Sequence, residues 1–215
     1  MTKTDTIQFF ETQIRERLLP VSETPGLDSR ALLAEITGQS PAWILAHPEE
    51  TVSSDQAGHL ASALTRLDQG LPLPYVIGRQ EFYGLDFQVS PAVLIPRPET
   101  EVLVEEALRW LSGHPEKTWA VDLGTGSGCI AVTLAVKIPA LQVAAVDLSA
   151  QALRVAGQNV KRHGVSGRVH LVPGDLLEAF GSPVDLICAN LPYIPQPALT
   201  ELAVARDEPV LALDG

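Results

Sequence analysis

One stretch of the chain decides the fold: WAVDLGTGSGCIAVTLAVK, residues 119–137. Its apolar beginning, residues 119–124, predicts a buried strand, and its apolar end, residues 129–137, predicts a helix. The glycines at every second position between them allow the backbone to turn sharply and to approach a ligand closely. A glycine turn that leads from a strand into a helix is typical of sheets that bind a nucleotide.

The residues around this stretch repeat the alternation of strand and helix. Apolar runs predict further strands at 142–149, 168–175 and 184–189, with helices at 99–111 and between the strands, including a short one near 176–180. Such alternation predicts a parallel sheet with helices on both faces. We therefore expect an α/β, Rossmann-like sheet. Its last predicted strand should lie beside the first, across the switch point where ligands bind.

The N-terminal part is different and predicts a small module of short helices. Its first helix carries apolar side chains at helical spacing: Ile7, Phe10, Ile14 and Leu18. Gly38 is typical of a helix C-terminal cap. Ser40 before Pro41 is typical of a helix N-terminus. Ser53 and Gln56 are spaced as a capping box.

We expect three parts along the chain. A helical domain should occupy residues 1–72, a β-hairpin connector residues 73–98, and the α/β domain residues 99–215. The hairpin is predicted because Phe82, Phe87 and Val89 alternate around Gly84, and because prolines follow at the end of the connector.

Composition and residue spacing disfavour a nucleic acid ligand and a metal site. The chain is 46% hydrophobic, enough for a sizeable core, and its formal net charge is −11 with only 15 lysines and arginines. Proteins that bind nucleic acid backbones usually carry a basic face. We therefore expect no direct nucleic acid partner. The five histidines show no ligand spacing with cysteine, so we also expect no metal site.

The sequence also indicates the cellular compartment of the protein. No apolar run approaches the roughly 20 residues that span a bilayer. The N-terminal residues are charged and amphipathic, unlike a signal peptide. The two cysteines, Cys129 and Cys188, offer no disulfide framework. We expect a cytoplasmic protein without a membrane-spanning segment.

The spacing of the glycines in DLGTGSG (122–128) indicates the kind of nucleotide. A dinucleotide fingerprint would need its third glycine at position 129, which is Cys129. The observed G-x-G-x-G pattern fits the nucleoside of S-adenosylmethionine better than NAD. Asp147 closes the second strand, where it could accept hydrogen bonds from both ribose hydroxyls, and Asp175 closes the third, near the expected adenine. The alternative is that the glycines serve the turn alone.

The segment CANLPYIPQP (188–197) places a polar amide directly after an apolar strand. If that strand lies beside the first, Asn190 faces the reactive end of the nucleoside. The alternative is that Asn190 only caps the strand and that Pro192 starts a loop.

Together these motifs resemble a known family. The glycine turn, Asp147, Asp175, Asn-Leu-Pro-Tyr (190–193), EFYG (81–84) and LIPRPETE (94–101) are similar to those of the bacterial release factor glutamine methyltransferases, the PrmC/HemK family. The likeness covers nearly all of residues 71–215, and the helical N-terminal module fits as well. Asn-Pro-Pro-Tyr alone is shared with many amine and amide methyltransferases, whereas LIPRPETE beside EFYG is much more specific.

The resemblance implies an enzyme that uses S-adenosylmethionine to methylate the glutamine of the Gly-Gly-Gln loop of peptide chain release factors. The N-terminal helices would help to hold that partner. Residues 96–100 would close over the methionine end of the cofactor. The implied cofactor-binding residues are Gly124, Thr125, Gly126, Ser127, Gly128, Asp147, Asp175, Leu176 and Asn190.

The implied catalytic residues are Asn190 and Tyr193, and the substrate-binding residues are Asn190, Leu191, Pro192 and Tyr193. The Asn190 carbonyl and the backbone carbonyl of Leu191 would each accept one N–H of the substrate amide. These acceptors would favour the positive charge that develops on its nitrogen. Tyr193 would pack against the flat amide.

The chain departs from the family pattern in two places. Leu191 stands where the family has a proline; the inferred contact uses a backbone carbonyl, so we expect activity to tolerate the change. After Gly215 a family member would continue through further strands. We therefore expect an incomplete sheet whose last strand, an exposed edge, favours self-association and lowers activity.

Two other functions remain open from the sequence. An adenine-amine methyltransferase acting on nucleic acid shares the Asn190 motif, but the acidic composition disfavours it. A non-catalytic remnant that binds the cofactor or the release factor would agree with the missing strands, but the intact motifs disfavour it.

Overall fold

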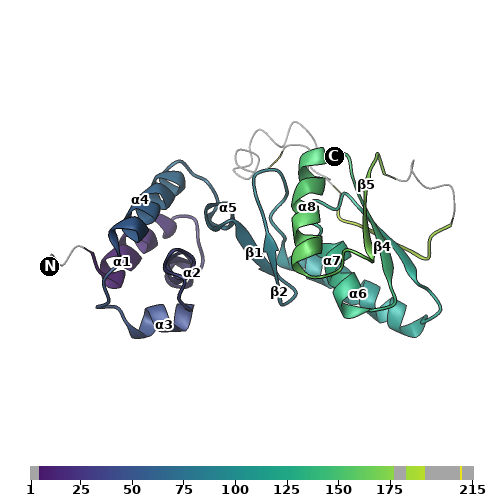
Figure 1. Cartoon of the computed structure of the whole chain (residues 1–215), viewed down its shortest axis with the longest axis horizontal. Coiled ribbons are helices and arrows are strands. Elements are labelled where there is room, and N and C mark those ends of the chain that lie inside the picture. Colours follow the sequence, from purple (N-terminus) through teal and green to yellow (C-terminus); the bar gives the residue numbers. More distant parts are fainter. Residues whose placement is uncertain (1–4, 177–182, 192–208, 210–215) are drawn as a thin grey trace. The chain divides into compact units, whose positions relative to one another are not determined.

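The computed structural model describes residues 5–176, 183–191 and 209 (Figure 1). Contacts divide the chain into two compact units, Met1–Ile77 and Gly78–Gly215. The hairpin therefore belongs to the second unit. The division into a helical partner-recognition domain, a connector and a methyltransferase domain stays a proposal about function.

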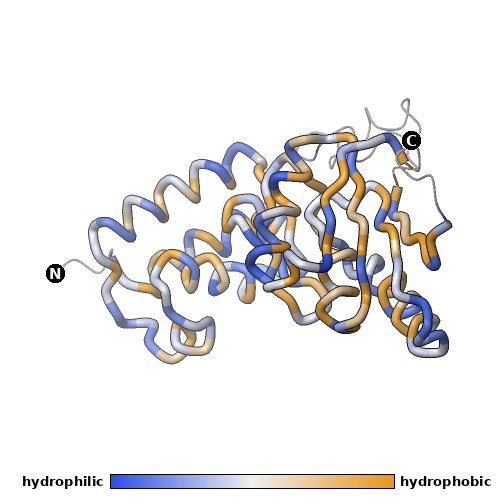
Figure 2. The backbone as a smooth tube through the Cα atoms, turned by 45° about the vertical axis from the view of Figure 1, so that its right-hand side comes forward, coloured by the Kyte–Doolittle hydropathy of each residue, from blue (hydrophilic) through white to orange (hydrophobic). Residues whose placement is uncertain are grey.

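The first unit is helical. In Figure 2, hydrophilic and hydrophobic positions alternate along these helices, as in amphipathic segments that bury one face. The buried face of the first helix carries the four apolar residues predicted from the sequence, and the unit has its own apolar core. Its helices are α1 (Ile7–Leu18), α2 (Pro25–Thr37), α3 (Pro41–Ala46), α4 (Ser54–Asp68) and α5 (Leu73–Ile77).

Local capping explains where these helices begin and end. The Ser40 hydroxyl accepts the backbone N–H of Trp43, and Ser53 and Gln56 form the predicted capping box. Gly38 ends α2 in the left-handed conformation, with φ 72°. Helix α2 begins at Pro25, because a proline fits the first turn of a helix.

The second unit opens with the predicted hairpin. Strands β1 (Arg79–Phe82) and β2 (Leu85–Gln88) pair in antiparallel fashion. The two turn residues, Tyr83 and Gly84, both have positive φ, 53° and 74°, which matches the twist of a two-residue hairpin turn. Phe82 and Phe87 are buried, with their ring centroids 6.1 Å apart.

A four-stranded parallel sheet forms the centre of the second unit, in the order β5-β4-β3-β6. The last strand in sequence therefore lies beside the first strand of the sheet, as predicted. The elements are α6 (Pro98–Gly113), β3 (Trp119–Leu123), α7 (Cys129–Lys137), β4 (Gln142–Asp147), α8 (Ala150–Arg162), β5 (Val169–Pro173) and β6 (Leu186–Ala189).

Alternation along the strands separates two apolar layers. Ala120, Val143 and Ala145 belong to the core that α6, α7 and α8 cover. Their neighbours Val121 and Ala144 face the other side, in a smaller apolar cluster. Among the described residues, helices cover only the first of these faces. The short helix predicted near residues 176–180 lies largely outside the described ranges.

None of the helices in the described part of the chain is both long enough and apolar enough to cross a membrane.

Candidate functional site

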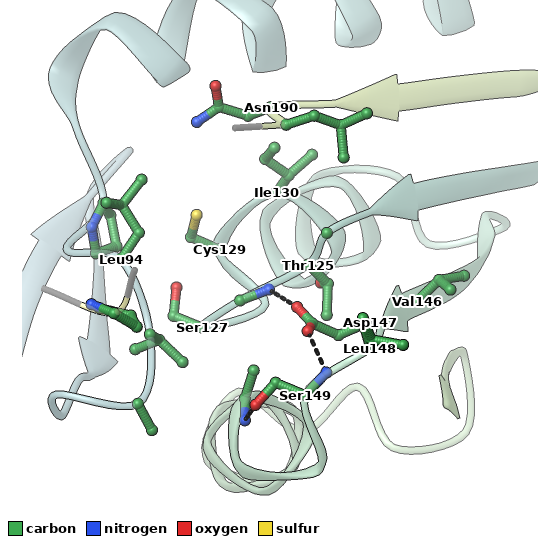
Figure 3. A pocket seen from close by; sticks show the side chains of 18 of the residues that line it. Leu94, Thr125, Ser127, Cys129, Ile130, Val146, Asp147, Leu148, Ser149 and Asn190 are labelled. Carbon is green, nitrogen blue, oxygen red and sulfur yellow. Dashed lines mark hydrogen bonds between the residues drawn. The ribbon is translucent and has the colours of Figure 1, made fainter. Parts of the chain in front are cut away.

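A cavity of about 290 Å³ lies at the carboxyl ends of the strands, within the second unit. Figure 3 shows side chains that line it. Ligands of open α/β sheets bind in this position. The walls come from the loop at 92–97, Thr100, the glycine turn, the residues that follow β4 and β5, and residues 190–191.

The glycine turn lies between two polar strand ends. In the sheet register Leu123 pairs with Val146 on one side and with Ala189 on the other. The next residues, Asp147 and Asn190, therefore flank Gly124 from its two neighbouring strands, with the glycine turn between them in Figure 3. This arrangement brings together the two polar residues that the sequence singled out.

Two glycines of the turn are required for different reasons. Gly124 has φ 66°, and an added Cβ would lie 3.1 Å from a methyl of Leu191. Gly128 has φ 81° and precedes α7; an added Cβ would lie 3.2 Å from the Cβ of Ala156 in α8. Gly124 and Gly126 line the cavity, as do Thr125 and Ser127. Gly128 packs between two helices instead.

Asp122, in β3, stabilises the glycine turn through hydrogen bonds. This buried carboxylate accepts the Thr125 hydroxyl at 2.6 Å and the Ala131 backbone N–H at 3.1 Å through the same oxygen, Oδ2. Burial raises the pKa of Asp122 to about 7, since the charged form is desolvated, and the nearby charge of Asp147 adds to the rise. The glycine turn is thus tied to the start of α7 by a carboxyl that titrates near neutral pH.

Asp147, at the end of β4, also stabilises the glycine turn through hydrogen bonds. Its Oδ2 accepts the Gly126 N–H at 2.8 Å, and its Oδ1 accepts the Ser149 N–H at 2.8 Å (Figure 3). Each carboxylate oxygen can accept a second hydrogen bond, so acceptor capacity remains toward the cavity. A carboxylate with spare acceptors fits a ribose diol.

Apolar side chains supply much of the remaining wall. Ile130, Leu148 and the loop at 92–97 line the cavity together with Cys129. Burial raises the pKa of the Cys129 thiol to about 12, with a contribution from Asp122. The thiol is therefore neutral and acts as part of the apolar wall. A cavity with apolar walls and a few polar groups matches the usual form of a small-molecule or cofactor site.

Asp175 and Leu176 follow β5 and also line the cavity. Leu176 has φ 46°, a conformation that a leucine rarely adopts and that costs about 1 kcal/mol. Such strain is often found where a chain shapes a ligand site. That both residues border the adenine stays a prediction.

Asn190 leaves β6 at the cavity wall and bonds to a residue on another element. Its Nδ2 donates to the hydroxyl of Thr100, at 3.1 Å, in the first turn of α6. The amide oxygen Oδ1 is the remaining polar atom of the side chain. Leu191 lines the cavity as well, whereas Pro192 and Tyr193 lie outside the described residues.

Sequence reasoning missed two residues that organise the site. The first is Thr100, which it assigned only to a segment over the cofactor. The second is Asn159 in α8, a buried amide. Its Nδ2 donates to the carbonyls of Ser127 and Gln88, and its Oδ1 accepts the Gln88 N–H. A polar residue on the otherwise apolar side of α8 was the signal for it.

No cluster of three or more histidine, cysteine or acidic residues that could hold a metal ion occurs among the residues that the structure describes.

Two family models match the chain. The PrmC N-terminal domain matches residues 12–78, and the methyltransferase small domain matches residues 100–207. The two matches therefore cover most of the helical unit and most of the α/β unit.

Curated relatives match over most of the chain. A protein of Moorella thermoacetica is 45% identical over 195 residues, which cover 90% of this chain and 69% of the relative. One of Chlorobaculum tepidum is 39% identical over 202 residues, covering 89% and 69%. One of Geobacter sulfurreducens is 41% identical over 196 residues, covering 90% and 67%. Each of the three is named release factor glutamine methyltransferase.

Proposed function

This chain belongs to the release factor glutamine methyltransferase family, and we propose that it methylates the glutamine side chain of the Gly-Gly-Gln loop of peptide chain release factors. The methyl donor is S-adenosylmethionine. The acceptor is the side-chain amide nitrogen, and the products are an N-methylated glutamine and S-adenosylhomocysteine.

One observation carries the proposal: the orientation of Asn190 at the cavity wall. Its Nδ2 is bound to Thr100, so Oδ1 remains to accept an N–H from a substrate. An amide nitrogen is a poor nucleophile because its lone pair is delocalised into the carbonyl. An acceptor beside that nitrogen stabilises the positive charge that develops on it during methyl transfer.

The backbone carbonyl of Leu191 would supply the second acceptor, for the other N–H of the substrate. Two acceptors fix both the position and the direction of the nitrogen, which is the main requirement of a direct transfer. Methyl transfer first gives an N-methylated amide cation, which is a strong acid and loses one N–H proton to water without help. The mechanism therefore needs no side chain as a base.

The residues around the cavity fit S-adenosylmethionine. When bound, it supplies an electrophilic methyl group on a sulfonium. Asp147 would accept the ribose hydroxyls, Asp175 and Leu176 would border the adenine, and the glycine turn would pass close to the nucleoside. In this proposal Asn190 lies at the reactive end, across the turn from Asp147.

The proposed protein partner and the proposed cellular compartment agree with the net charge of the chain. We assign partner recognition to the helical unit, and we place the reaction in the cytoplasm, where translation ends. A formal net charge of −11 disfavours direct binding to nucleic acid. The substrate would therefore be the release factor alone.

A methyl-transfer assay with labelled S-adenosylmethionine tests the proposal. The chain should label a release factor and should fail to label the same factor with its Gly-Gly-Gln glutamine replaced by asparagine. Asn190→Ala should abolish labelling, because removing one such acceptor costs about 3 kcal/mol or more. Leu191→Pro, which restores the family residue, should leave labelling equal or higher.

Adenine-containing oligonucleotides, offered in parallel, separate the alternatives. Labelling of the oligonucleotide in place of the release factor would show an adenine methyltransferase. Binding of S-adenosylmethionine without labelling of either substrate would show a non-catalytic protein. Either result would overturn the proposal.

A further inference from the structure

We propose that Thr100 is a positioning residue that holds the Asn190 amide in its productive orientation. The inference rests on the proposed function, because it takes Asn190 as the acceptor for the substrate amide. Thr100 itself would act only through Asn190.

The contact joins two distant parts of the second unit. Thr100 lies in the first turn of α6, and Asn190, 90 residues later, follows β6. Thr100 is only 7% exposed, whereas Asn190 is exposed. Both line the cavity. A buried hydroxyl thus holds an exposed amide at the cavity wall.

Thr100 is itself held firmly. Its backbone N–H donates to the carbonyl of Arg97 at 3.0 Å, in a turn that begins with Pro98. The next residue, Glu101, accepts the Tyr83 N–H at 2.7 Å and so ties the same turn to the hairpin. Val104, one turn further, is completely buried in the core. The hydroxyl therefore has a fixed position relative to the sheet.

A fixed partner matters because an asparagine amide has a donor end and an acceptor end. Rotation by half a turn would direct Nδ2 instead of Oδ1 toward the substrate, and two N–H groups would then face each other. Asn190 is the first residue beyond its strand and is exposed, so packing restrains it little. A hydroxyl can pair with either end of an amide. In the structure the Thr100 hydroxyl accepts from Nδ2, so this bond restrains the side chain with Oδ1 left available.

This contact also links the two motifs that made the resemblance specific. Residues 94–101 contain Thr100 and Glu101, and residues 81–84 contain Tyr83. Glu101 binds the hairpin turn and Thr100 binds Asn190, so consecutive residues connect both motifs to the candidate catalytic amide. The first turn of α6 is thus an anchor for the acceptor.

The test compares Thr100→Val, which has nearly the same shape without the hydroxyl, with Thr100→Ser, which keeps the hydroxyl. For methylation of the release factor, kcat should fall roughly tenfold in Thr100→Val, the equivalent of one hydrogen bond. It should return to within about threefold of the parent in Thr100→Ser. The KM for release factor, the Tm and the calorimetric affinity for S-adenosylmethionine should change little in either variant.

A second measurement does not depend on turnover. In ¹⁵N spectra of the free protein, the side-chain amide of Asn190 is assigned from the signal that Asn190→Ala removes. Thr100→Val should shift this signal and speed its exchange with water, whereas Thr100→Ser should not. A parent chain that methylates no release factor would overturn the proposed function, and this signal would still decide whether the contact exists.

Three results would overturn the inference about Thr100. The Asn190 signal could be the same in Thr100→Val and in the parent. The kcat could stay at the parental value although the signal shifts. The two variants could also lose kcat equally, or lose it together with Tm, as expected of a residue that serves packing alone.

Discussion

Two carboxylates hold the glycine turn, and their surroundings give them different properties. Asp147 is partly exposed in the cavity wall and accepts two backbone N–H groups. Asp122 is completely buried, and its Oδ1 has no hydrogen-bond partner among the described residues. Asp147 is therefore suited to contact a ligand. Asp122 makes the stability of the glycine turn depend on pH.

Asp147→Ala should weaken the binding of S-adenosylmethionine at least tenfold. The change removes two expected charge-assisted hydrogen bonds to the ribose, each worth about 1.5–3 kcal/mol at most, and releases the Gly126 N–H. Calorimetric titration measures the effect. Glu106→Ala, at an exposed position outside the cavity, should leave the affinity as it is. Equal affinity of Asp147→Ala and the parent would exclude the ribose contact.

Asp122→Asn should change how stability depends on pH. The Asp122 pKa is about 7 in the folded chain and ordinarily 3.8, so between these values the folded state binds the extra proton. Rising pH therefore lowers the free energy of unfolding: this contribution is complete below about pH 4 and is lost by about pH 7. The asparagine does not titrate.

The difference in free energy of unfolding between Asp122→Asn and the parent should thus move in favour of the variant as pH rises from about 4 to about 7, and then level off. The total change should approach about 4 kcal/mol. Urea unfolding of both proteins across this range measures it. A difference that is constant with pH would show that Asp122 is ionised throughout.

At the scale of elements, the close crossing of α7 and α8 positions the glycine turn. Gly128 leads into α7 and touches Ala156 in α8. One turn further along α8, Asn159 donates to the Ser127 carbonyl and bonds to Gln88 in the hairpin. The turn, α8 and the hairpin are therefore held together by one packing contact and one buried amide.

Gly128→Ala should lower the free energy of unfolding by about 2–4 kcal/mol. Positive φ costs an alanine about 1 kcal/mol, and the overpacked contact with Ala156 adds about 1–3 kcal/mol. Gly84→Ala is a matched control, since Gly84 has a similar φ and no atom within 4 Å of an added Cβ. It should cost only about 1 kcal/mol. Equal losses in urea unfolding would contradict the tight crossing.

At the scale of the whole molecule, each unit has its own core. Leu33 is buried in the core of the helical unit, and Leu134 in the core of the α/β unit. All residues that line the cavity belong to the second unit. Binding of S-adenosylmethionine should therefore depend on the second unit alone, whereas methylation of a release factor should need both.

Leu33→Ala and Leu134→Ala should each destabilise one unit by about 2–5 kcal/mol. Scanning calorimetry should show that S-adenosylmethionine raises the transition that Leu134→Ala lowers, and not the one that Leu33→Ala lowers. Leu33→Ala should keep its cofactor affinity and lose methylation of release factor. A single transition that both variants lower would show that the units unfold together.

The sequence by itself determined the features that depend on neighbouring residues. The helix caps at Ser40 and Ser53, the hairpin around Gly84 and the glycine turn follow from local hydrogen bonding and from the φ values that glycine permits. The parallel pairing of β3 with β6 could also be predicted from the sequence, because alternating strands and helices are compatible with only a few sheet topologies. Asp147 and Asn190 could be predicted as site residues because each ends such a strand.

Only the tertiary structure decided which distant groups meet. Thr100 bonds to a residue 90 positions away, and Asn159 bonds to Gln88 and Ser127, 71 and 32 positions away. The raised pKa of Asp122 likewise depends on how completely other elements exclude water from it. Hydrophobic periodicity reports which side of an element is buried, but a hydrogen bond between two elements depends on their packed positions to within a few tenths of an ångström.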